Sequence, residues 1–488
     1  MNRRDLDLFI GGSWTAAQSG ERISVANPAR TSEVVGSIAA GAPADVDRAV
    51  AAAKAAQRGW AALSLADRAD RLRAAGANLA SIDPAAPEAL TREMGKVLAE
   101  SQMDFQTPPM VWSHYLQDVP ATEELFTERF SDEFGDVLIR RRPFGVVGAI
   151  VPWNWPIALL GVKLGPALLA GNTIVAVPSP NASLGVLLAV EALATALPAG
   201  VVNVVTGLGD QVGAALAGHP DVRMVAFTGG TEVGRAVART AAGALKPTVL
   251  ELGGNDAAVL LDDAVVTDAL VRSLAAGFTM TSGQVCFAIK RLYVHESLFA
   301  DVVGALSDVL SEAVVGDGLD PAVTMGPLAN RRQFDRVRAL VAEAESAGAK
   351  VQALGRQQDP GTWQDGFFEL PQLITDVDPG AGIVVEEQFG PALPVLPFET
   401  DEQALELVNG TDYGLTCSIW SADSQRALRL AERAETGVAT INQHGMLGFD
   451  IRAPFGGTKS SGYGREMGNE GLLEFTWSQQ VNDRHPQF

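Results

Sequence analysis

Three side chains in the sequence are of types that could together attack and then hydrolyse a carbonyl compound. Cys286 ends the segment Ser-Gly-Gln-Val-Cys, and a cysteine nucleophile needs a populated thiolate and donors for the oxyanion that forms on attack. Asn154 stands between two prolines at the end of a predicted strand, where its amide could supply one donor. Glu251 follows an apolar strand and precedes two glycines. Partial burial there would raise its pKa and let it act as a base near neutrality.

Each of these residues also has an ordinary structural interpretation. A lone cysteine in an apolar setting is often a small buried hydrophobic residue, Asn154 could be a turn residue, and Glu251 could be exposed at the end of a strand. Cys417 lies in a strand-like segment, and we interpret it as part of the core. The five histidines show no ligand spacing, so we expect no metal site.

The composition indicates a folded acidic protein. The 488 residues carry 37 Lys and Arg against 58 Asp and Glu, a net charge of −21, which argues against a nucleic-acid or membrane partner. With 47% hydrophobic residues the chain can fill two to four domain cores of roughly 100 to 200 residues each. Two cysteines and no apolar stretch at the amino terminus favour a cytoplasmic location.

Short apolar strands alternate with helical segments over most of the chain. Residues 45–80 are typical of helices, and the first series of predicted strands is 146–151, 173–177, 201–205, 224–227 and 248–251. A second series comprises 257–261, a helix from about 266, and strands at 291–295, 384–385, 416–420 and 438–442. This alternation predicts an α/β fold of stacked βαβ units. Residues 128–142 could form a projecting hairpin.

The motifs taken together resemble the aldehyde dehydrogenase superfamily, from residue 27 to about residue 481. The resemblance is carried, in the family's order, by Pro-Trp-Asn-Trp-Pro at 152–156, Phe-Thr-Gly at 227–229, Glu-Leu-Gly-Gly-Asn at 251–255, Gly-Gln-Val-Cys at 283–286, Glu-Gln-Phe-Gly-Pro at 387–391 and Pro-Phe-Gly-Gly-Thr-Lys at 454–459. It implies oxidation of an aldehyde to a carboxylic acid with NAD as cofactor, and NADP as the alternative.

The resemblance implies a role for each candidate residue. Cys286 attacks the aldehyde, Asn154 and the Cys286 backbone N–H stabilise the oxyanion, and Glu251 activates the water that hydrolyses the thioester. Lys163 and Glu466 form a proton-relay network with Glu251. The residues expected at the cofactor are Pro152, Trp153, Val177, Ser179, Phe227, Thr228, Gly229, Gly230, Val233, Leu252, Glu387 and Phe389. Those expected at the substrate are Trp155, Leu159, Val162, Val285 and Phe287, whose apolar character favours hydrophobic aldehydes.

The sequence departs from the family pattern where the adenosine and pyrophosphate would bind. Val177 stands where a Lys is usual, Pro180 where NAD-preferring members often have Glu, and Gly230 where Ser is frequent. We therefore expect ordinary chemistry with weakened cofactor binding. Thr281 also replaces a more usual Asn, which could alter how the Cys286 loop is held.

The resemblance implies three parts and leaves two other functions open. A Rossmann-like, doubly wound cofactor domain would comprise residues 1–127 and 143–253, a second α/β catalytic domain residues 254–455, and a protruding β oligomerisation element residues 128–142 and 474–488. Such a projection leaves sheet edges that need partners, so we expect a homodimer or homotetramer. The alternatives are a CoA-acylating enzyme, whose members typically lack the base, and a non-catalytic protein on the same fold.

Overall fold

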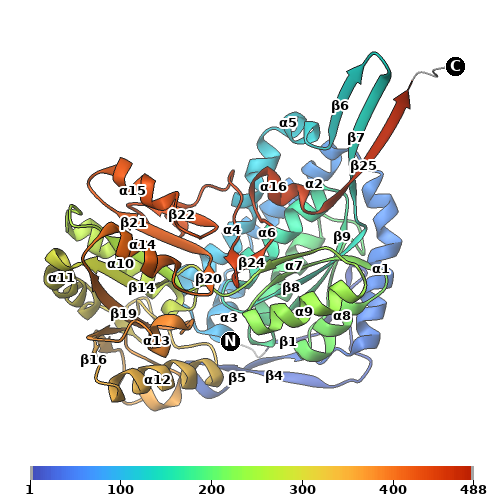
Figure 1. Ribbon diagram of the computed structural model, residues 1–488. Coiled ribbons are helices and arrows are strands. Elements are labelled where there is room, and N and C mark those ends of the chain that lie inside the picture. Colours follow the sequence, from blue (N-terminus) through green and yellow to red (C-terminus); the bar gives the residue numbers. More distant parts are fainter. Residues whose placement is uncertain (1–3, 485–488) are drawn as a thin grey trace.

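The computed structural model describes residues 4–484, in which two large sheets lie in two adjoining lobes, each covered by helices (Figure 1). Most strands of both sheets run parallel, and the helices between them pack on the sheet faces. This arrangement buries both faces of the central strands. No helix between residues 4 and 484 is both long and apolar enough to cross a membrane.

The first lobe is built on an eight-stranded sheet, and its five predicted strands are confirmed. They are β8 (Val146–Val151), β9 (Thr173–Pro178), β10 (Val202–Val204), β11 (Val222–Thr228) and β12 (Thr248–Glu251). All five are parallel to their neighbours, in the order β12-β11-β8-β9-β10. Short antiparallel strands extend the sheet beyond both ends: β24 (Gly462–Tyr463), β2 (Leu8–Ile10) and β3 (Ser13–Thr15).

Helices cover both faces of this sheet. The crossovers run through α6 (Pro156–Leu169), α7 (Ser183–Ala194), α8 (Ala214–Gly218) and α9 (Thr231–Gly243), and the amino-terminal helices are α1 (Pro43–Ala61), α2 (Leu65–Ala80), α3 (Ala85–Met94) and α4 (Leu98–Gln117). Helices predicted over residues 45–80 are therefore confirmed. The glycines of α6 let α4 pack closely, because a Cβ at Gly165 would lie 2.3 Å from the Trp112 ring.

The amino-terminal segment also contributes a small sheet that the sequence did not predict. It consists of β1 (Arg4–Leu6), β5 (Arg30–Ala39) and β4 (Arg22–Asn27), with β5 in the middle. These strands mix polar and apolar residues without a clean alternation, because they lie at the edge of the lobe and are only partly buried.

The second lobe is built on a seven-stranded sheet. Its order is β16 (Lys350–Ala353), β18 (Gln372–Thr375), β19 (Ala392–Phe398), β14 (Ile289–His295), β13 (Asp256–Leu260), β21 (Thr416–Trp420) and β22 (Val438–Ile441). The helices on it are α10 (Asp268–Thr279), α11 (Phe299–Ser311), α12 (Arg331–Ser346), α14 (Asp401–Asn409) and α15 (Ser424–Ala431).

One predicted strand of this lobe is wrong. Residues 384–385 lie in α13 (Gly382–Val385), a single helical turn, because an isolated apolar pair carries no periodicity that would distinguish strand from helix. The strand β19, which pairs with β14 on the side away from β13, was not predicted.

A three-stranded antiparallel sheet projects from the first lobe, at the top right of Figure 1. The predicted hairpin is confirmed as β6 (Thr127–Asp132) and β7 (Gly135–Pro143), and β25 (Thr476–Arg484) pairs along the whole of β7. Phe130, Phe134, Trp477 and Val481 are exposed on this sheet. Residues 485–488 of the expected element lie outside the described residues.

Candidate active site

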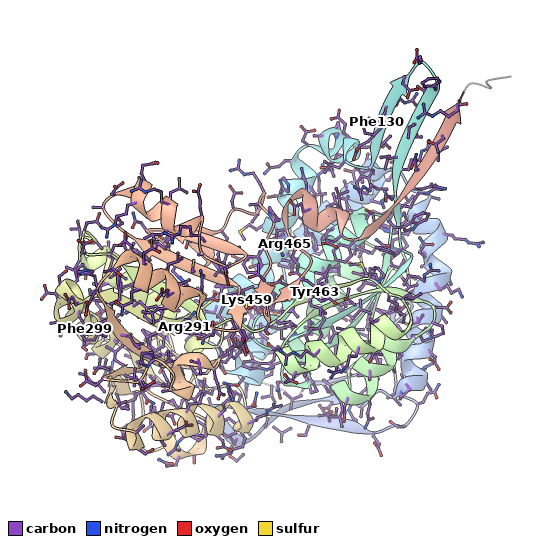
Figure 2. The ribbon with its side chains drawn as sticks, viewed as in Figure 1. Phe130, Arg291, Phe299, Lys459, Tyr463 and Arg465 are labelled. Atoms are coloured by element: carbon purple, nitrogen blue, oxygen red, sulfur yellow. The ribbon has the colours of Figure 1, made fainter. Side chains whose placement is uncertain are left out.

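The carboxyl ends of neighbouring parallel strands bring the first set of predicted residues together. Asn154 follows β8, Thr228 ends β11, and Glu251 ends β12 directly beside Thr228 in the sheet register. Ligands of open α/β sheets bind at this edge. The carboxyl-terminal segment joins the lobes here, because β24 pairs with β12 while β23 (Thr458–Lys459) pairs with β20 (Tyr413–Gly414) of the second lobe. Figure 2 shows its Lys459, Tyr463 and Arg465 in the middle of the molecule.

Cys286 lies in a tightly held loop between α10 and β14. Thr281, Ser282 and Gly283 before it have φ angles of 51°, 58° and 73°, a left-handed run that only glycine adopts without cost. Thr281 is held from the first lobe: its N–H donates to Glu100 at 2.8 Å, and its hydroxyl accepts from the Trp155 ring N–H at 3.0 Å. An Asn, more usual at this position, would adopt this backbone at lower cost.

Asn154 reaches across to the Cys286 loop. Its Nδ2 donates to the carbonyl of Gln284 at 3.0 Å, and an amide nitrogen has a second N–H for a ligand. Its own backbone carbonyl accepts from the buried Lys96 ammonium at 3.0 Å, which also pairs with Asp104 at 2.7 Å. Asp104 in turn accepts the N–H of Ala158 in the first turn of α6. This charged network fixes the turn that carries Asn154.

Side chains from other elements also hold the carbonyls around the nucleophile. The buried Lys290 ammonium donates to the carbonyls of Val285 at 2.8 Å and of Cys286 at 2.6 Å. The ring of His444, also buried, lies 2.8 Å from the Phe287 carbonyl through Nε2. Burial lowers the pKa of His444 to about 4, so the ring is neutral, and because a carbonyl only accepts, Nε2 carries the proton.

The environment of the Cys286 thiol opposes its ionisation in the ligand-free protein. Burial is the main cause that raises the pKa of the thiol to about 12; the charges of Glu251, Asp256 and Glu387 act in the same direction, and the charge of Lys290 opposes them. A Cβ at Gly254, three residues after Glu251, would lie 2.5 Å from the Cys286 carbonyl oxygen, so the segment that follows the predicted base packs against the predicted nucleophile. Cys417 is buried in β21 as expected.

Glu251 has the environment of a general base. Burial and then the neighbouring Glu466 carboxylate raise its pKa well above the usual value, against the lowering effects of Lys163 and Arg465. Its buried Oε1 has no hydrogen-bond partner among the described residues, so this oxygen is free to accept a proton from a ligand. Lys163 donates to Glu466 and, at 2.6 Å, to the hydroxyl of Thr228. The predicted supporting pair is thus assembled next to Glu251.

Three of the residues expected at the cofactor, Trp153, Glu387 and Phe389, lie near the Cys286 segment or one another. The rings of Trp153 and Phe389 meet edge to face with centroids 5.5 Å apart. Glu387 accepts the N–H of Gly254 at 3.0 Å, and a Cβ at Gly253 would lie 2.3 Å from its carboxylate. Burial raises the pKa of Glu387 above its usual value, and the charge of Lys290 offsets part of this increase.

The start of α9 is suited to a pyrophosphate. Gly230 is its N-cap and offers no side chain to the first N–H groups of the helix, and a Cβ there would meet nothing within 4 Å. Free amides and the positive end of the helix dipole favour anions. Val233 in the first turn is exposed, and Leu252 packs against Gly234 behind it. The donors and the open space therefore fit the phosphates of a dinucleotide.

The adenosine end of the predicted site is apolar. Val177 is 2% exposed and belongs to the same buried core cluster as Val225 and Phe227. The hydroxyl of Ser179, which caps the short turn Pro180–Ala182, accepts the N–H of Asn181 at 3.4 Å. Gly229 is also tightly placed, because a Cβ there would lie 2.7 Å from the Phe227 ring.

Four of the five residues expected at the substrate form one apolar cluster beside Cys286. Trp155 and Val285 are buried in it, and Leu159 and Phe287 pack against it together with Met280 and Met446. The Phe287 ring also contacts Phe449, with centroids 5.0 Å apart. Val162 instead packs in the main core of the first lobe.

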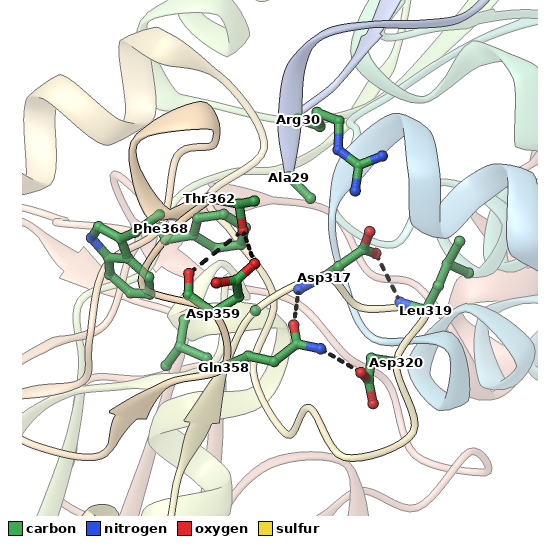
Figure 3. A pocket seen from close by; sticks show the side chains of 12 residues that line it. Ala29, Arg30, Asp317, Leu319, Asp320, Gln358, Asp359, Thr362 and Phe368 are labelled. Carbon is green, nitrogen blue, oxygen red and sulfur yellow. Dashed lines mark hydrogen bonds between the residues drawn. The ribbon is translucent and has the colours of Figure 1, made fainter.

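Several residues that shape the site were not predicted: Lys96, Glu100, Asp104, Lys290 and His444. Their one sequence signal is a charged or polar side chain in a largely apolar run, and nothing in the sequence reveals the distant carbonyls that they hold. A separate pocket of about 330 Å³ between Arg30, Asp317 and Trp363 is lined by none of the predicted site residues (Figure 3).

Comparisons with known proteins agree with this geometry. The model of the Aldehyde dehydrogenase family matches residues 14–481. Geranial dehydrogenase of Castellaniella defragrans is 39% identical over 477 residues, 95% of this chain and 96% of that protein. The structure of betaine aldehyde dehydrogenase from Staphylococcus aureus in complex with NAD+ superposes with a TM-score of 0.91 at 31% identity, covering 98% of this chain and 94% of that one.

A further solved structure is that of an E. coli NADP dependent enzyme, which superposes with a TM-score of 0.92 at 32% identity and covers 98% of each chain. The expected Rossmann-like and catalytic α/β architecture is confirmed by these matches, as is the expectation of a nicotinamide-dependent aldehyde-oxidising enzyme. The chain belongs to the aldehyde dehydrogenase family.

Proposed function

We propose that the protein oxidises a hydrophobic aliphatic or aromatic aldehyde to the carboxylic acid through a thioester on Cys286. The observation that carries this proposal is the meeting of three groups from both lobes. Asn154 bonds to the loop of Cys286 two residues before the sulfur, and the backbone three residues after Glu251 packs against the Cys286 carbonyl. A thiol, an oxyanion donor and a base at one site are the parts that acyl chemistry requires.

The side chains act in sequence. The Cys286 thiol releases its proton to solvent and the thiolate adds to the aldehyde carbon; the second Nδ2–H of Asn154 and the Cys286 backbone N–H stabilise the oxyanion of the thiohemiacetal. A nicotinamide dinucleotide held by Glu387 and the start of α9 would supply the hydride acceptor that oxidation of the thiohemiacetal to the thioester requires. Glu251 then takes a proton from water, which attacks the thioester and releases the acid and the thiol. Lys163 donates a hydrogen bond to Glu466, and these two charges act in opposite directions on the pKa of Glu251.

NAD is the cofactor we propose, held through Glu387 and the start of α9, with the Trp153–Phe389 pair beside the nicotinamide. The absence of a Glu after Ser179 removes repulsion toward a 2′-phosphate, while Val177 removes the attraction of a Lys, so these changes oppose each other for NADP. Titration of the apoprotein should give weak NAD binding, above the low-micromolar range. A low-micromolar Kd would mean that other residues compensate.

The apolar cluster around Trp155, Leu159 and Phe287 supports a hydrophobic substrate. The relative named geranial dehydrogenase agrees with this class. We expect kcat/KM for hexanal and benzaldehyde to exceed that for succinate semialdehyde, because a carboxylate would be desolvated without a cationic partner in this cluster. A preference for succinate semialdehyde would contradict the assignment.

Glu251 argues against the two alternatives that the sequence left open. A CoA-acylating enzyme needs no base to activate water, and a non-catalytic protein needs none of the three groups. Mixing the protein with NAD and a panel of aldehydes should give a burst of NADH absorbance followed by steady turnover without CoA. A turnover that requires CoA, or no absorbance change with any aldehyde, would favour one of the alternatives.

We further propose the domain division 1–127 with 143–253, 254–455, and 128–142 with 474–488, a cytoplasmic location, and assembly into a homodimer or homotetramer. The exposed Phe130 and Trp477 on the projecting sheet support assembly through that element. Light scattering of the purified protein should give at least twice the monomer mass.

A further inference from the structure

Lys290 is a buried cation beside the proposed nucleophile. It is the second residue of β14, and its side chain is 2% exposed. A buried ammonium costs free energy unless hydrogen bonds and a counter-charge compensate it. Its contacts therefore indicate what the charge does in this fold.

The hydrogen bonds of Lys290 go to the backbone of the nucleophile loop. Nζ donates to the carbonyls of Val285 at 2.8 Å and Cys286 at 2.6 Å, the peptide groups on either side of the Cys286 Cα. With the Gln284 carbonyl bonded to Asn154 and the Phe287 carbonyl to His444, four consecutive carbonyls are held by side chains. The orientation of the sulfur thus depends on Lys290 more directly than on any side chain that bonds one carbonyl.

The other side of Lys290 faces the proposed nicotinamide end of the cofactor. Its Nζ lies 3.8 Å from Oε1 of Glu387 and 5.9 Å from the centroid of the Phe389 ring. Glu387 in turn accepts the N–H of Gly254. One ammonium therefore touches the loop of the nucleophile and the carboxylate that would hold the cofactor.

We propose that Lys290 is a positioning residue that ties the Cys286 loop to Glu387, so that the reactivity of the sulfur and the affinity for the cofactor depend on one buried charge. This inference rests on the proposed function of Cys286 and Glu387.

The charges around the sulfur predict whether each substitution raises or lowers the thiolate population of Cys286. Glu251 of β12, Asp256 of β13 and Glu387 raise the pKa of Cys286, and Lys290 of β14 lowers it; His444 faces the same loop as a neutral ring. Removing the ammonium should therefore reduce the thiolate population, and removing the Glu387 charge should increase it. Removing the ammonium also raises the pKa of Glu387, which favours a protonated and weaker acceptor for the cofactor.

The test measures alkylation of Cys286 by iodoacetamide in the full-length apoprotein, followed by mass spectrometry of the peptide that contains it. Lys290→Gln keeps donors near the loop without the charge, and Lys290→Met removes both. At pH 8 we expect both variants to react at least about tenfold more slowly, which corresponds to one pKa unit. Glu387→Gln should react several-fold faster.

Lys246→Gln is the matched control. Lys246 also donates to two backbone carbonyls, those of Ala217 and His219, but it precedes the amino end of β12, at the opposite end of that strand from Glu251. We expect its alkylation rate to stay within twofold of the native rate. Titration with NAD, followed by quenching of tryptophan fluorescence, should show at least about fivefold weaker binding for Lys290→Gln and no change for Lys246→Gln.

Two results would overturn the inference. A Lys290→Gln protein that is folded and is alkylated at the native rate would remove the link to the sulfur, and an unchanged Kd for NAD would remove the link to Glu387. Slower alkylation in Glu387→Gln would show that loop distortion, not charge, controls the rate, and this variant decides the question if the Lys290 variants do not fold. Oxidation retained by Cys286→Ala would instead contradict the proposed function, whatever these rates are.

Discussion

The two ends of the proposed cofactor cleft are built differently. At the catalytic end, buried charged and polar side chains such as Lys96, Lys290 and His444 hold the backbone that carries Asn154 and Cys286. At the adenosine end, Val177 is packed in the core and Gly230 leaves open space. Bond-making atoms must be held to fractions of an ångström, whereas a cofactor tail is bound by helix amides and shape and tolerates substitution. We therefore expect changes in the reacting side chains to affect the chemical steps and changes at the adenosine end to affect cofactor binding, whereas changes at Lys290 should affect both.

The largest effect should come from Cys286→Ala. Without the sulfur no thiohemiacetal forms, so aldehyde oxidation should fall at least about a thousandfold. Binding of NAD should stay within twofold of the native value, because the Cys286 side chain is not among the groups that we propose to hold the cofactor. Cys417→Ala is the control, since this buried cysteine lies in β21 and should leave oxidation largely intact.

Glu251→Gln should separate the two chemical steps. We expect the burst of NADH to remain while steady turnover falls about 10²- to 10⁴-fold, because no base activates the water. Stopped-flow absorbance distinguishes the two phases. A native steady rate in this variant would show that another residue is the base.

The same residue predicts a pH dependence. Glu251 acts when it is deprotonated, and burial and Glu466 raise its pKa well above 4.5. Steady turnover of the native enzyme should therefore decline as the pH falls through a value well above that of an ordinary carboxyl group. Glu251→Gln should lack this decline, and its presence there would assign the titration to a different group.

Asn154→Ala should reduce kcat by about 10²- to 10³-fold, the usual cost of one oxyanion donor. Asn154→Asp keeps the size but replaces the N–H donor with an acceptor, so it should be at least as slow. The Kd for NAD should hardly change in either variant. A loss of less than threefold in kcat would remove Asn154 from the oxyanion site.

The smallest effect is expected at the adenosine end. Gly230→Ser places a hydroxyl at the N-cap of α9 in open space, where it can donate a hydrogen bond to a phosphate, so it should tighten NAD binding a few-fold. Gly243→Ser, at the other end of the same helix, also meets no neighbour and should leave the Kd unchanged. Weaker binding in Gly230→Ser would mean that the glycine is needed for close approach of the cofactor.

Strands were predicted best from the sequence where both faces of the strand are buried. The runs at 146–151 and 248–251 match β8 and β12 because strands buried on both faces are continuously apolar. The strand β19 was missed because Pro394 and Pro397 interrupt its pattern, and an apolar pair in α13 was mistaken for a strand. Pairing inside a sheet overrides such local signals.

The residues proposed to react were predicted from their local sequence context. The residues that hold the backbone of the site were missed, because their partners are far away in the sequence. Cys286, Asn154 and Glu251 stand in contexts that favour chemistry, and Lys163 with Glu466 came from the family resemblance. Lys96 bonds to a residue 58 positions away, and His444 to one 157 positions away. Only the fold brings such partners together, so no local pattern could indicate them.

The covalent acyl-enzyme is the central claim, and mass spectrometry of Glu251→Gln after mixing with NAD and hexanal tests it most directly. We predict that the peptide containing Cys286 gains the mass of the hexanoyl group and that hydroxylamine removes it. An unmodified Cys286 during the NADH burst, or an acyl group on another residue, would contradict the account.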